Sequence, residues 1–594
     1  MNKKISFLAA GVALAMAACS PGVPTAPTAA PKPADPAKPA APAPAAGGNS
    51  FNGAWPYSIP PEGHFNAFNS AKQINLGIYA ELIQQPLAMF KWADSSYAPA
   101  LAEKWENKGS TFEVTLRDAK WSDGKAVTSA DVVNTFVLRR LQNTAEWKYL
   151  GGIEAKGDKL VVFNVKTPSS LMERLVLRTQ IRDSQTYGAI AAKAAALYAG
   201  GKDHTSDEGK AIAKELSDLR PAVWIASGPY NIDVKSLTES LATLPKNANA
   251  WNASKVKFDK LLIYQGETAA VTPLVLQGDV DYATHGFPPA TEKSFVDQGI
   301  RIQRSPLFTG PGLYFNYDVA PLDKPAVRQA IAQAIRRDIS GQAALGQSGV
   351  AVKLMAGVSD NVIAQWMSPD DIAKLNKYEY NVDKAAETMK AAGFTKGGDG
   401  ICADASGKKL EFELSFPSDF ADWSASAETV VNDLNKFGFK ITPRGVQSQQ
   451  HLADVNAGKF QMAYRAWGTA NPHPFYSYEQ DLFVHNYVRT GAAGKGMNMP
   501  LKQKTSKGDI DLEKLALDTG VGTDAASQKK IVTELAMAYN ELLPQVQIFE
   551  RYGNNPMRDK RVNWLPADNA IFKNPHQVDP FTTIMIQEGM IGGK

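Results

Sequence analysis

Residues able to do acid–base, metal or nucleophilic chemistry do not form a catalytic pattern in this chain. The seven histidines are His64, His204, His285, His451, His473, His485 and His576. None belongs to an H-E-x-x-H pair and neither cysteine to a C-x-x-C pair, so the sequence gives no basis for a zinc site. A phosphate-binding G-x-x-x-x-G-K-[ST] loop and a G-x-S-x-G elbow are also absent. We therefore expect no enzyme, no catalytic residue, no metal and no cofactor. Carboxylate pairs for glycoside hydrolysis come together only in a fold, so a hydrolase remains the remote alternative.

The first of the two cysteines stands at the end of an export signal. Lys3 and Lys4 precede an apolar stretch from Ile5 to Ala15, which is too short to span a bilayer. The following Met16-Ala17-Ala18-Cys19 resembles the lipobox of bacterial lipoproteins, in which the cysteine becomes the lipid-modified first residue, although Met16 replaces the usual leucine. We predict a lipoprotein signal peptide over residues 1–19, with lipidation at Cys19. The alternative is an ordinary secretory signal.

A proline- and alanine-rich segment follows, over residues 20–50. It contains nine prolines and almost no large apolar side chain. Such a segment cannot bury enough surface to offset the entropy of folding, and it favours an extended chain of about 3.1 Å per residue. We predict a disordered tether that holds a globular body away from a membrane. The expected location is the cell envelope, outside the cytoplasmic membrane and lipid-anchored.

The remaining residues, 51–594, have the composition of a globular protein. Hydrophobic residues make up 44% of the whole chain and charged residues 21%, with a formal net charge of +4. This small charge implies neither nucleic acid nor an acidic membrane surface as a partner. The length suggests roughly two to four domains. If Cys19 carries lipid, Cys402 has no partner for an internal disulfide.

Strand-like and helix-like segments alternate along this body. Thr111 to Arg117 alternates as a half-buried strand does, and Thr128 to Asp131 has the form of a capping box that opens a helix. Pro325 to Arg337 and Ser424 to Phe437 have helical apolar spacing, and Gly438 is expected to end the second of these helices. This order predicts an α/β fold.

Several blocks resemble one known family. The most specific block runs from Pro99 to Val132 and contains P-A-L-A-E-K-W, T-F, L-R, W-S-D-G and T-S-A-D-V. Further blocks follow in the same order as in the family, at Ser227–Tyr230, Asn249–Trp251, Gly278–Tyr282, Phe315–Asn316, Val327–Ala330, Ala392–Phe394 and Leu543–Pro544. Over about residues 52–590 the chain resembles the extracellular solute-binding proteins of family 5, which are peptide, nickel and oligosaccharide receptors of ABC importers.

The resemblance implies a two-lobed fold of the periplasmic-binding-protein type, class II or cluster C, with an additional small inserted domain. The first lobe is expected from residues of about 51–90, 226–310 and 550–594. The inserted domain is expected over about 91–225 and the second lobe over about 311–549. Ligand is then enclosed when the two lobes close, and the importer recognises the closed form.

The resemblance places residues 460–474, F-Q-M-A-Y-R-A-W-G-T-A-N-P-H-P, at the cleft. Peptide receptors of the family carry an aspartate shortly after the tryptophan of this segment, and it pairs with the α-ammonium of the ligand. Trp467 and Gly468 are kept here, but Ala470 stands at the position of the acid and Asn471 follows. A neutral amide compensates a buried ammonium poorly, so Asn471 and Trp467 favour a hydroxyl-rich ligand. Arg465 is either a pocket residue or an ion-pair partner.

Three further elements are candidates for the cleft walls. Phe65 and Asn66 belong to the first loop, Tyr552 follows Leu543-Pro544 on an expected turn, and Trp423 precedes the helix expected near Ser424. The alternatives are surface loops for the first two elements and a core role for Trp423. The candidate ligand-binding residues are therefore Trp467, Gly468, Asn471, Arg465, Phe65, Asn66, Trp423 and Tyr552.

The function expected from the resemblance is that of a membrane-tethered receptor of an ABC importer. It would act as a monomer, capture a small molecule and deliver it to permease subunits. A short oligopeptide and an oligosaccharide both remain open as ligands, because the family favours the first and Ala470 favours the second.

Overall fold

The computed structural model describes residues 49–486 and 495–594. The predicted signal peptide, the lipidation site Cys19 and nearly all of the predicted tether lie outside these residues. The first strand begins at Ser50, so the folded part starts before the predicted boundary at residue 51. Within the described part, no helix is both long and apolar enough to cross a membrane.

A six-stranded sheet forms the first lobe, in the order β11-β23-β10-β1-β9-β8. Its central strand β1 runs parallel to β9 and β10, and all six of its residues are buried, as expected for a parallel strand covered on both faces. The strands are β1 Ser50–Trp55, β8 Leu241–Pro245, β9 Lys260–Gln265, β10 Tyr282–Ala283, β11 Arg301–Gln303 and β23 Asn555–Met557. The helices of this lobe are α5 Thr268–Gln277, α6 Pro289–Asp297 and α17 Phe581–Gln587.

An antiparallel four-stranded sheet, ordered β4-β5-β7-β6, forms the inserted domain. Its strands are β4 Ala102–Asn107, β5 Thr111–Leu116, β6 Leu150–Lys156 and β7 Leu160–Val165, and its helices are α1 Ser129–Leu141, α2 Met172–Leu177, α3 Ser184–Ala199 and α4 Asp207–Asp218. Strand β5 agrees with the predicted strand. The predicted capping box is confirmed, since the backbone N–H of Thr128 donates to Oδ2 of Asp131 at 2.8 Å. The short hairpin of β2 Ala88–Lys91 and β3 Ser96–Pro99 precedes this sheet.

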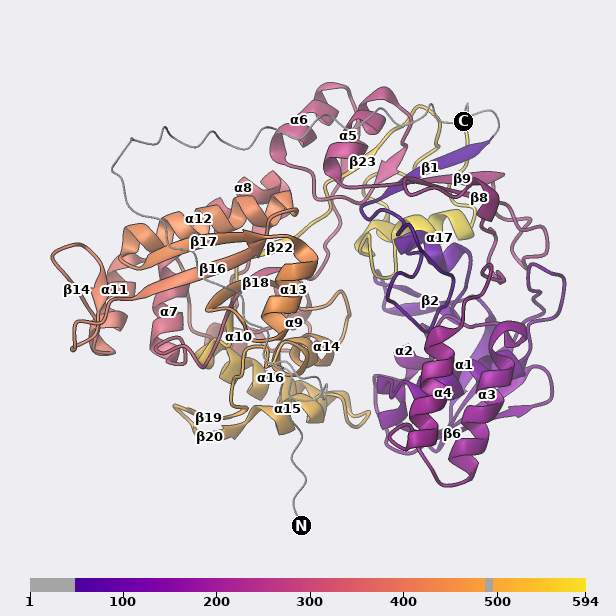
Figure 1. Ribbon diagram of the computed structural model, residues 1–594, viewed down its shortest axis with the longest axis horizontal. Helices are drawn as coiled ribbons and strands as arrows, with labels where there is room; N and C mark the ends of the chain where they lie inside the picture. The colour runs from indigo at the N-terminus through magenta and orange to yellow at the C-terminus, as the bar shows by residue number, and fades with distance from the viewer. Residues whose placement is uncertain (1–48, 487–494) are drawn as a thin grey trace, which may run out of the picture. The chain divides into compact units, whose positions relative to one another are not determined.

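A mixed five-stranded sheet, ordered β17-β16-β18-β12-β21, forms the second lobe. Helix α12 packs on β16 and β17 and lies beside α8 (Figure 1). The strands of this sheet are β12 Gly310–Phe315, β16 Glu411–Pro417, β17 Lys440–Val446, β18 Met462–Trp467 and β21 Gln545–Gln547. The helices are α7 Pro325–Ala334, α8 Arg337–Leu345, α9 Asp360–Ile363, α10 Pro369–Ala373, α11 Val382–Ala391, α12 Ala421–Phe437, α13 Ser448–Asn456, α14 Pro474–Glu479, α15 Leu512–Asp518 and α16 Ala525–Leu542. Short strand pairs complete it, namely β13 Gly349–Ala351 with β22 Phe549–Arg551, β14 Thr395–Lys396 with β15 Cys402–Ala403, and β19 Lys502–Thr505 with β20 Gly508–Asp511.

Two predicted helices differ from the observed ones. The helix that was predicted to reach Arg337 ends at Ala334, because Ile335 is extended and the backbone N–H of Arg336 donates to Asp433 of α12 at 2.9 Å. Helix α12 begins at Ala421, so Trp423 lies within its first turn and not before it. Gly438 ends α12 with a φ of +131°, as predicted.

The chain passes between the two lobes twice, through residues 304–309 and 548–554, which we call the crossover segments. The two segments are hydrogen-bonded to each other. The N–H of Leu307 donates to the carbonyl of Arg551 at 3.0 Å, and the N–H of Arg551 donates to the carbonyl of Thr309 at 2.9 Å. A paired two-segment connection of this kind is suited to hinge motion.

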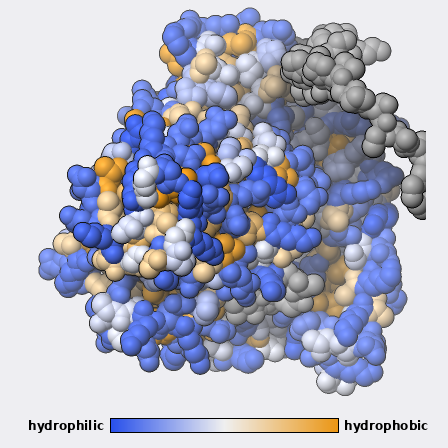
Figure 2. All heavy atoms as spheres, turned by 60° about the vertical axis from the view of Figure 1, so that its left-hand side comes forward, coloured by the Kyte–Doolittle hydropathy of each residue, from blue (hydrophilic) through white to orange (hydrophobic). Residues whose placement is uncertain are grey.

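The surface offers no extended apolar face in the view of Figure 2. Hydrophilic side chains cover most of this face, and hydrophobic residues appear as small separate patches. Cys402 is a free, buried cysteine.

Candidate ligand cavity lined by arginines

A cavity of about 410 Å³ lies where the inserted domain, the first lobe and the second lobe meet. The inserted domain contributes α1 and the segment 174–182, and the second lobe contributes Asn471 and Tyr476. Its most distinctive feature is a set of four arginines, Arg139, Arg174, Arg178 and Arg182. A cavity of this size is in the range of small-molecule sites.

Arg174 has one guanidinium nitrogen left for a ligand. Its Nε donates to Oδ1 of Asn471 at 2.9 Å, and its Nη2 donates to Oδ2 of Asp579 at 2.7 Å. Its side chain is only 9% exposed, and among the described residues Nη1 has no hydrogen-bond partner. Because a buried donor without an acceptor is costly, this nitrogen is a ready site for a ligand oxygen.

Asp579 holds two of the arginines in place. Its Oδ1 lies 2.6 Å from Nε of Arg178, and its Oδ2 also accepts from Nε1 of Trp92 at 3.0 Å. Burial by itself raises the pKa of the Asp579 carboxyl, but Arg174 and Arg178 outweigh burial and hold that pKa below its usual value. The φ of Asp579 is +53°, in the left-handed region that side-chain-bearing residues seldom adopt. Such strain persists only where the surroundings fix the residue firmly.

The cavity has more positive than negative charge. Arg139 is paired with Glu146 at 2.9 Å, and Arg178 is paired with Glu81 at 2.6 Å. Arg182 donates to the amide oxygen of Gln180 at 2.8 Å, and burial lowers its pKa to about 10, so it stays protonated at neutral pH. Four guanidinium groups and one carboxylate, that of Glu81, line the cavity, whereas Glu146, Asp579 and Asp183 act on the arginines from outside the lining. Burial raises the pKa of the Glu81 carboxyl, and Arg178 offsets part of this effect. The mostly positive lining suits an anionic group on a ligand.

Among the residues expected at the site, the structure brings Asn471 to this cavity. Phe65 and Asn66 come just before Ala67 and Phe68 of the cavity wall, but they are themselves buried. The ring of Phe65 packs edge-on against Trp224, and Nδ2 of Asn66 donates to the carbonyl of Leu216 at 2.6 Å. Both side chains are therefore engaged in contacts within the protein.

Trp467 and Gly468 do not expose a binding surface in this structure. Trp467 is fully buried, and its Nε1 donates to the carbonyl of Phe549 in a crossover segment at 3.2 Å. Gly468 is buried with a φ of +64°, and a Cβ there would lie 3.1 Å from the carbonyl of Phe308. Trp467 therefore packs between the second lobe and a crossover segment.

Arg465 and Trp423 line a second, mainly apolar pocket of about 310 Å³ in the second lobe. Phe420, Leu452 and Val455 supply apolar walls, and Nε1 of Trp423 is buried without a hydrogen-bond partner among the described residues. Ala466 of this pocket is five residues from Asn471, so their Cα atoms are at most about 18 Å apart. Strand β18 and the loop after it thus contribute residues to both compartments. Tyr552 lines neither compartment and accepts a hydrogen bond from Nδ2 of Asn361 at 2.8 Å.

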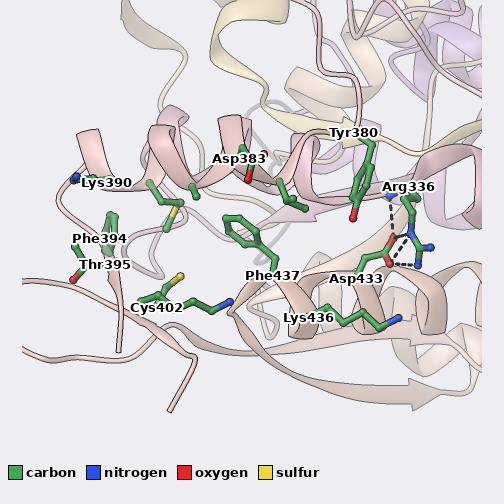
Figure 3. Close-up of a pocket in the computed structure, with 14 residues that line it drawn as sticks. Arg336, Tyr380, Asp383, Lys390, Phe394, Thr395, Cys402, Asp433, Lys436 and Phe437 are labelled. Atoms are coloured by element: carbon green, nitrogen blue, oxygen red, sulfur yellow. Dashed lines mark hydrogen bonds and ion pairs between the residues drawn. The ribbon is translucent and has the colours of Figure 1, made fainter. Parts of the chain in front are cut away.

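A larger cavity, of about 700 Å³, lies between α11 and α12 (Figure 3). Its floor includes Met389, Phe394 and Phe437, and at one end Arg336 and Asp433 form an ion pair of 2.5 Å. None of the candidate ligand-binding residues lines it. We do not assign it as the ligand site.

Sequence reasoning missed Arg174, Arg178 and Arg182. For Arg174 and Arg178 the spacing of four residues was the available signal, because residues four apart share a face of a helix. Arg182 lies beyond the end of α2, where this spacing gives no signal. Asp579, the partner of Arg174 and Arg178, lies about 400 residues further along the chain, and no sequence pattern links it to them. For metal binding, no cluster of three or more histidine, cysteine or acidic side chains occurs within residues 49–486 and 495–594.

Comparisons with known proteins agree with this architecture. The model of bacterial extracellular solute-binding proteins, family 5 Middle, matches residues 96–487, more than half of the chain. The dipeptide-binding protein of Escherichia coli is 26% identical over 327 residues, which span 52% of this chain and 58% of that protein. The nickel-binding periplasmic protein of Escherichia coli is 24% identical over 464 residues, which span 73% of this chain and 78% of that protein.

A solved structure shows the same fold over nearly the whole chain. It is the periplasmic oligopeptide-binding protein of Thermotoga maritima with mannohexaose bound, which superposes with a TM-score of 0.72 at 20% identity. The superposition covers 92% of this chain and 98% of that one. Together with the family match, this likeness confirms the predicted two-lobed α/β fold. The chain belongs to the bacterial extracellular solute-binding proteins of family 5.

Proposed function

We propose that this protein is the ligand-capturing receptor of an ABC importer and that it binds a short peptide through a carboxylate group. The observation that carries the ligand class is Nη1 of Arg174, a buried donor without a protein acceptor in a cavity that has an excess of positive charge. A carboxylate oxygen forms a charge-assisted hydrogen bond with such a donor and supplies the missing negative charge.

The second compartment suits the apolar part of the same ligand. Trp423, Phe420 and Leu452 offer a surface for a peptide side chain, and the indole N–H of Trp423 is available to a backbone carbonyl. Anchoring through the ligand's amine has no support at Ala470, which is buried and carries no charge. The C-terminal carboxylate of the peptide is therefore the group expected to be held most tightly.

An oligosaccharide is the second candidate ligand. The observations that favour it are the mannohexaose in the Thermotoga maritima structure and the aromatic wall of the second compartment. A neutral sugar, however, would leave the charge of the arginine cavity without a counter-charge, and desolvating an unpaired charge is costly.

The test compares one tripeptide library in two forms, with free C-terminal carboxylates and with C-terminal amides, alongside mannohexaose. A thermal-shift screen finds the binders, because a ligand at 100 times its Kd adds about 2.7 kcal/mol of stability. Calorimetry then measures affinity. We expect the free acids to bind at least about 10-fold more tightly than the amides, since a hydrogen bond to a charged group contributes roughly 1.5–3 kcal/mol.

Arg174→Lys should remove this preference, because lysine keeps the charge but cannot make the forked contacts of a guanidinium. Arg444→Lys is the matched control, since Arg444 pairs with Asp454 in the second lobe and lines neither compartment. Equal affinity for acids and amides would refute carboxylate recognition, and binding of mannohexaose alone would favour the sugar.

We further propose that the receptor is anchored by lipid at Cys19, works as a monomer outside the cytoplasmic membrane and delivers its ligand to separate permease subunits. The export signal, the lipobox-like Met16 to Cys19 and the proline-rich residues 20–48 support this location. Two acyl chains anchor a protein stably where one does not. ATP hydrolysis would belong to other subunits of the importer.

A further inference from the structure

The inserted domain and the second lobe contact each other directly, apart from the crossover segments. Phe475, in the first turn of α14 in the second lobe, is 1% exposed and is part of the hydrophobic cluster of the inserted domain, together with Tyr149 and Leu171. A side chain of one lobe thus completes the core of another domain. Such burial is a favourable contact that needs no ligand.

Backbone hydrogen bonds join the same two parts. The N–H of Ser170 donates to the carbonyl of Gly522 at 3.0 Å, and the N–H of Gly522 donates to the carbonyl of Pro168 at 2.7 Å. Nε2 of Gln528 adds bonds to Oγ of Ser170 at 2.8 Å and to the carbonyl of Gly522 at 2.9 Å. Segments about 350 residues apart in sequence therefore form a short parallel β-bridge.

The two surfaces fit so closely at this contact that there is no room for one additional methyl group at Gly520. A Cβ added at Gly520 would lie 2.8 Å from Cδ1 of Leu171 and 2.8 Å from the hydroxyl oxygen of Tyr149. At the edge of the contact, Lys148 of the inserted domain pairs with Glu479 of the second lobe at 3.0 Å. The two surfaces are thus fitted to each other in packing, hydrogen bonding and charge.

We propose that these contacts form a latch that holds the receptor closed without a ligand. The latch consists of Tyr149 and Pro168–Leu171 on the inserted domain and of Phe475, Gly520–Gly522 and Gln528 on the second lobe. In the population-shift description, the latch sets the closed fraction of the free protein, and the ligand adds its own differential affinity.

The latch and the arginine cavity form together. Phe475 follows Asn471 by only four residues, so seating Phe475 also brings Asn471 to Nε of Arg174. This link to the cavity rests on the proposed function, whereas the latch itself does not. Weakening the latch should lower the apparent affinity for ligand in proportion to the closed fraction that is lost.

Hydrogen exchange on the ligand-free protein tests the latch directly. The amides of Ser170 and Gly522 donate only across the contact, so we expect them to be protected in the absence of any ligand. If both amides exchange as fast as exposed loop amides, the latch does not form in the free protein and the inference fails. The result does not depend on which ligand the receptor binds, so failure of the peptide proposal would leave it intact.

Gly520→Ala should force the two sides of the latch apart, because its added methyl group has no room while the latch is closed. We expect it to abolish protection at Ser170 and Gly522 and to increase the radius of gyration of the ligand-free protein. Gly398→Ala is the matched control, since a Cβ at Gly398 in the same lobe would meet no atom within 4 Å. Phe475→Leu, which keeps an apolar side chain, is the second variant and should reduce protection partially. Wild-type protection and radius in Gly520→Ala would overturn the proposal.

Discussion

At the scale of single residues, the arginine cavity depends on a buried carboxylate that is shared. Asp579 binds both Arg174 and Arg178 and accepts from Trp92, so its own charge is fully used within the protein. This arrangement fixes the orientation of the Arg174 guanidinium and leaves its Nη1 available to a ligand. Pre-organised donors of this kind lower the entropy lost on binding.

Asn471→Asp tests the charge of the cavity with almost no change in shape. A carboxylate at residue 471 would pair with Nε of Arg174 and reduce the excess positive charge of the cavity lining. We expect affinity for a peptide with a free carboxylate to fall about 10-fold or more, the scale of a hydrogen bond to a charged group. Affinity for a neutral oligosaccharide should change little.

Calorimetry on Asn471→Asp and on Asn471→Ala measures these affinities and separates the effect of charge from the loss of a contact. Unchanged peptide affinity in Asn471→Asp would contradict an anionic ligand.

At the scale of elements, short segments carry the polar groups of the arginine cavity and of the crossover segments. Helix α2 has only six residues, and Arg178 stands at its C-terminal end, one turn after Arg174. The loop after β18 carries Asn471, and strand β22 of a crossover segment carries Glu550. Oε2 of Glu550 accepts from Oγ of Ser359 at 2.8 Å, and its Oε1 accepts from Nδ2 of Asn361 at 3.0 Å.

Glu550→Gln should change how stability depends on pH. Burial raises the pKa of Glu550 from 4.5 to about 7, so the folded protein binds this proton more tightly than the unfolded chain does. The tighter binding of this proton adds to the free energy of unfolding. This contribution is fully present below about pH 4.5 and is lost as the pH rises through 7, by at most about 3 kcal/mol. The glutamine variant, which does not titrate, should lack this loss of stability. Denaturant unfolding between pH 4.5 and 7.5 measures it, with the exposed Glu106→Gln as control. A variant that keeps the wild-type slope would contradict the prediction.

At the scale of the whole molecule, the crossover segments join the two lobes, and the second lobe also meets the inserted domain at the latch. The arginine cavity is built from both lobes and the inserted domain, so it is complete only when they are together. Ligand binding and closure are then thermodynamically coupled.

Ligand should therefore compact the protein, and more so when the latch is weakened. In solution scattering we expect a smaller radius of gyration at saturating ligand, with a larger decrease in Gly520→Ala than in the wild type. The reason is that a more open free state has further to close. An identical radius with and without ligand in Gly520→Ala would count against closure by hinge motion.

Cys19→Ser tests the anchor separately from the fold. We expect the variant to lose incorporation of labelled fatty acid in the native host, because the thiol of Cys19 is the proposed attachment point. Its thermal unfolding should match that of the wild type, since the proline-rich residues before Ser50 supply no large apolar side chains to a core. Labelling of the serine variant would show that lipid is not attached at Cys19.

The sequence by itself determined the family, the α/β class and several local elements. The block from Pro99 to Val132 carries turn, cap and strand signals that act over a few residues, and β5 and the capping box at Thr128 follow from them. Only the tertiary structure decided which candidate residues lie together and which are used in packing. It buries Trp467 against Phe549, uses Phe65 and Asn66 in packing, and joins Arg174 to Asp579 across about 400 residues. Local hydrogen-bonding and helical patterns are visible in a short stretch of chain. Burial and the pairing of charges depend on which distant segments meet, and that is settled by packing of the whole fold.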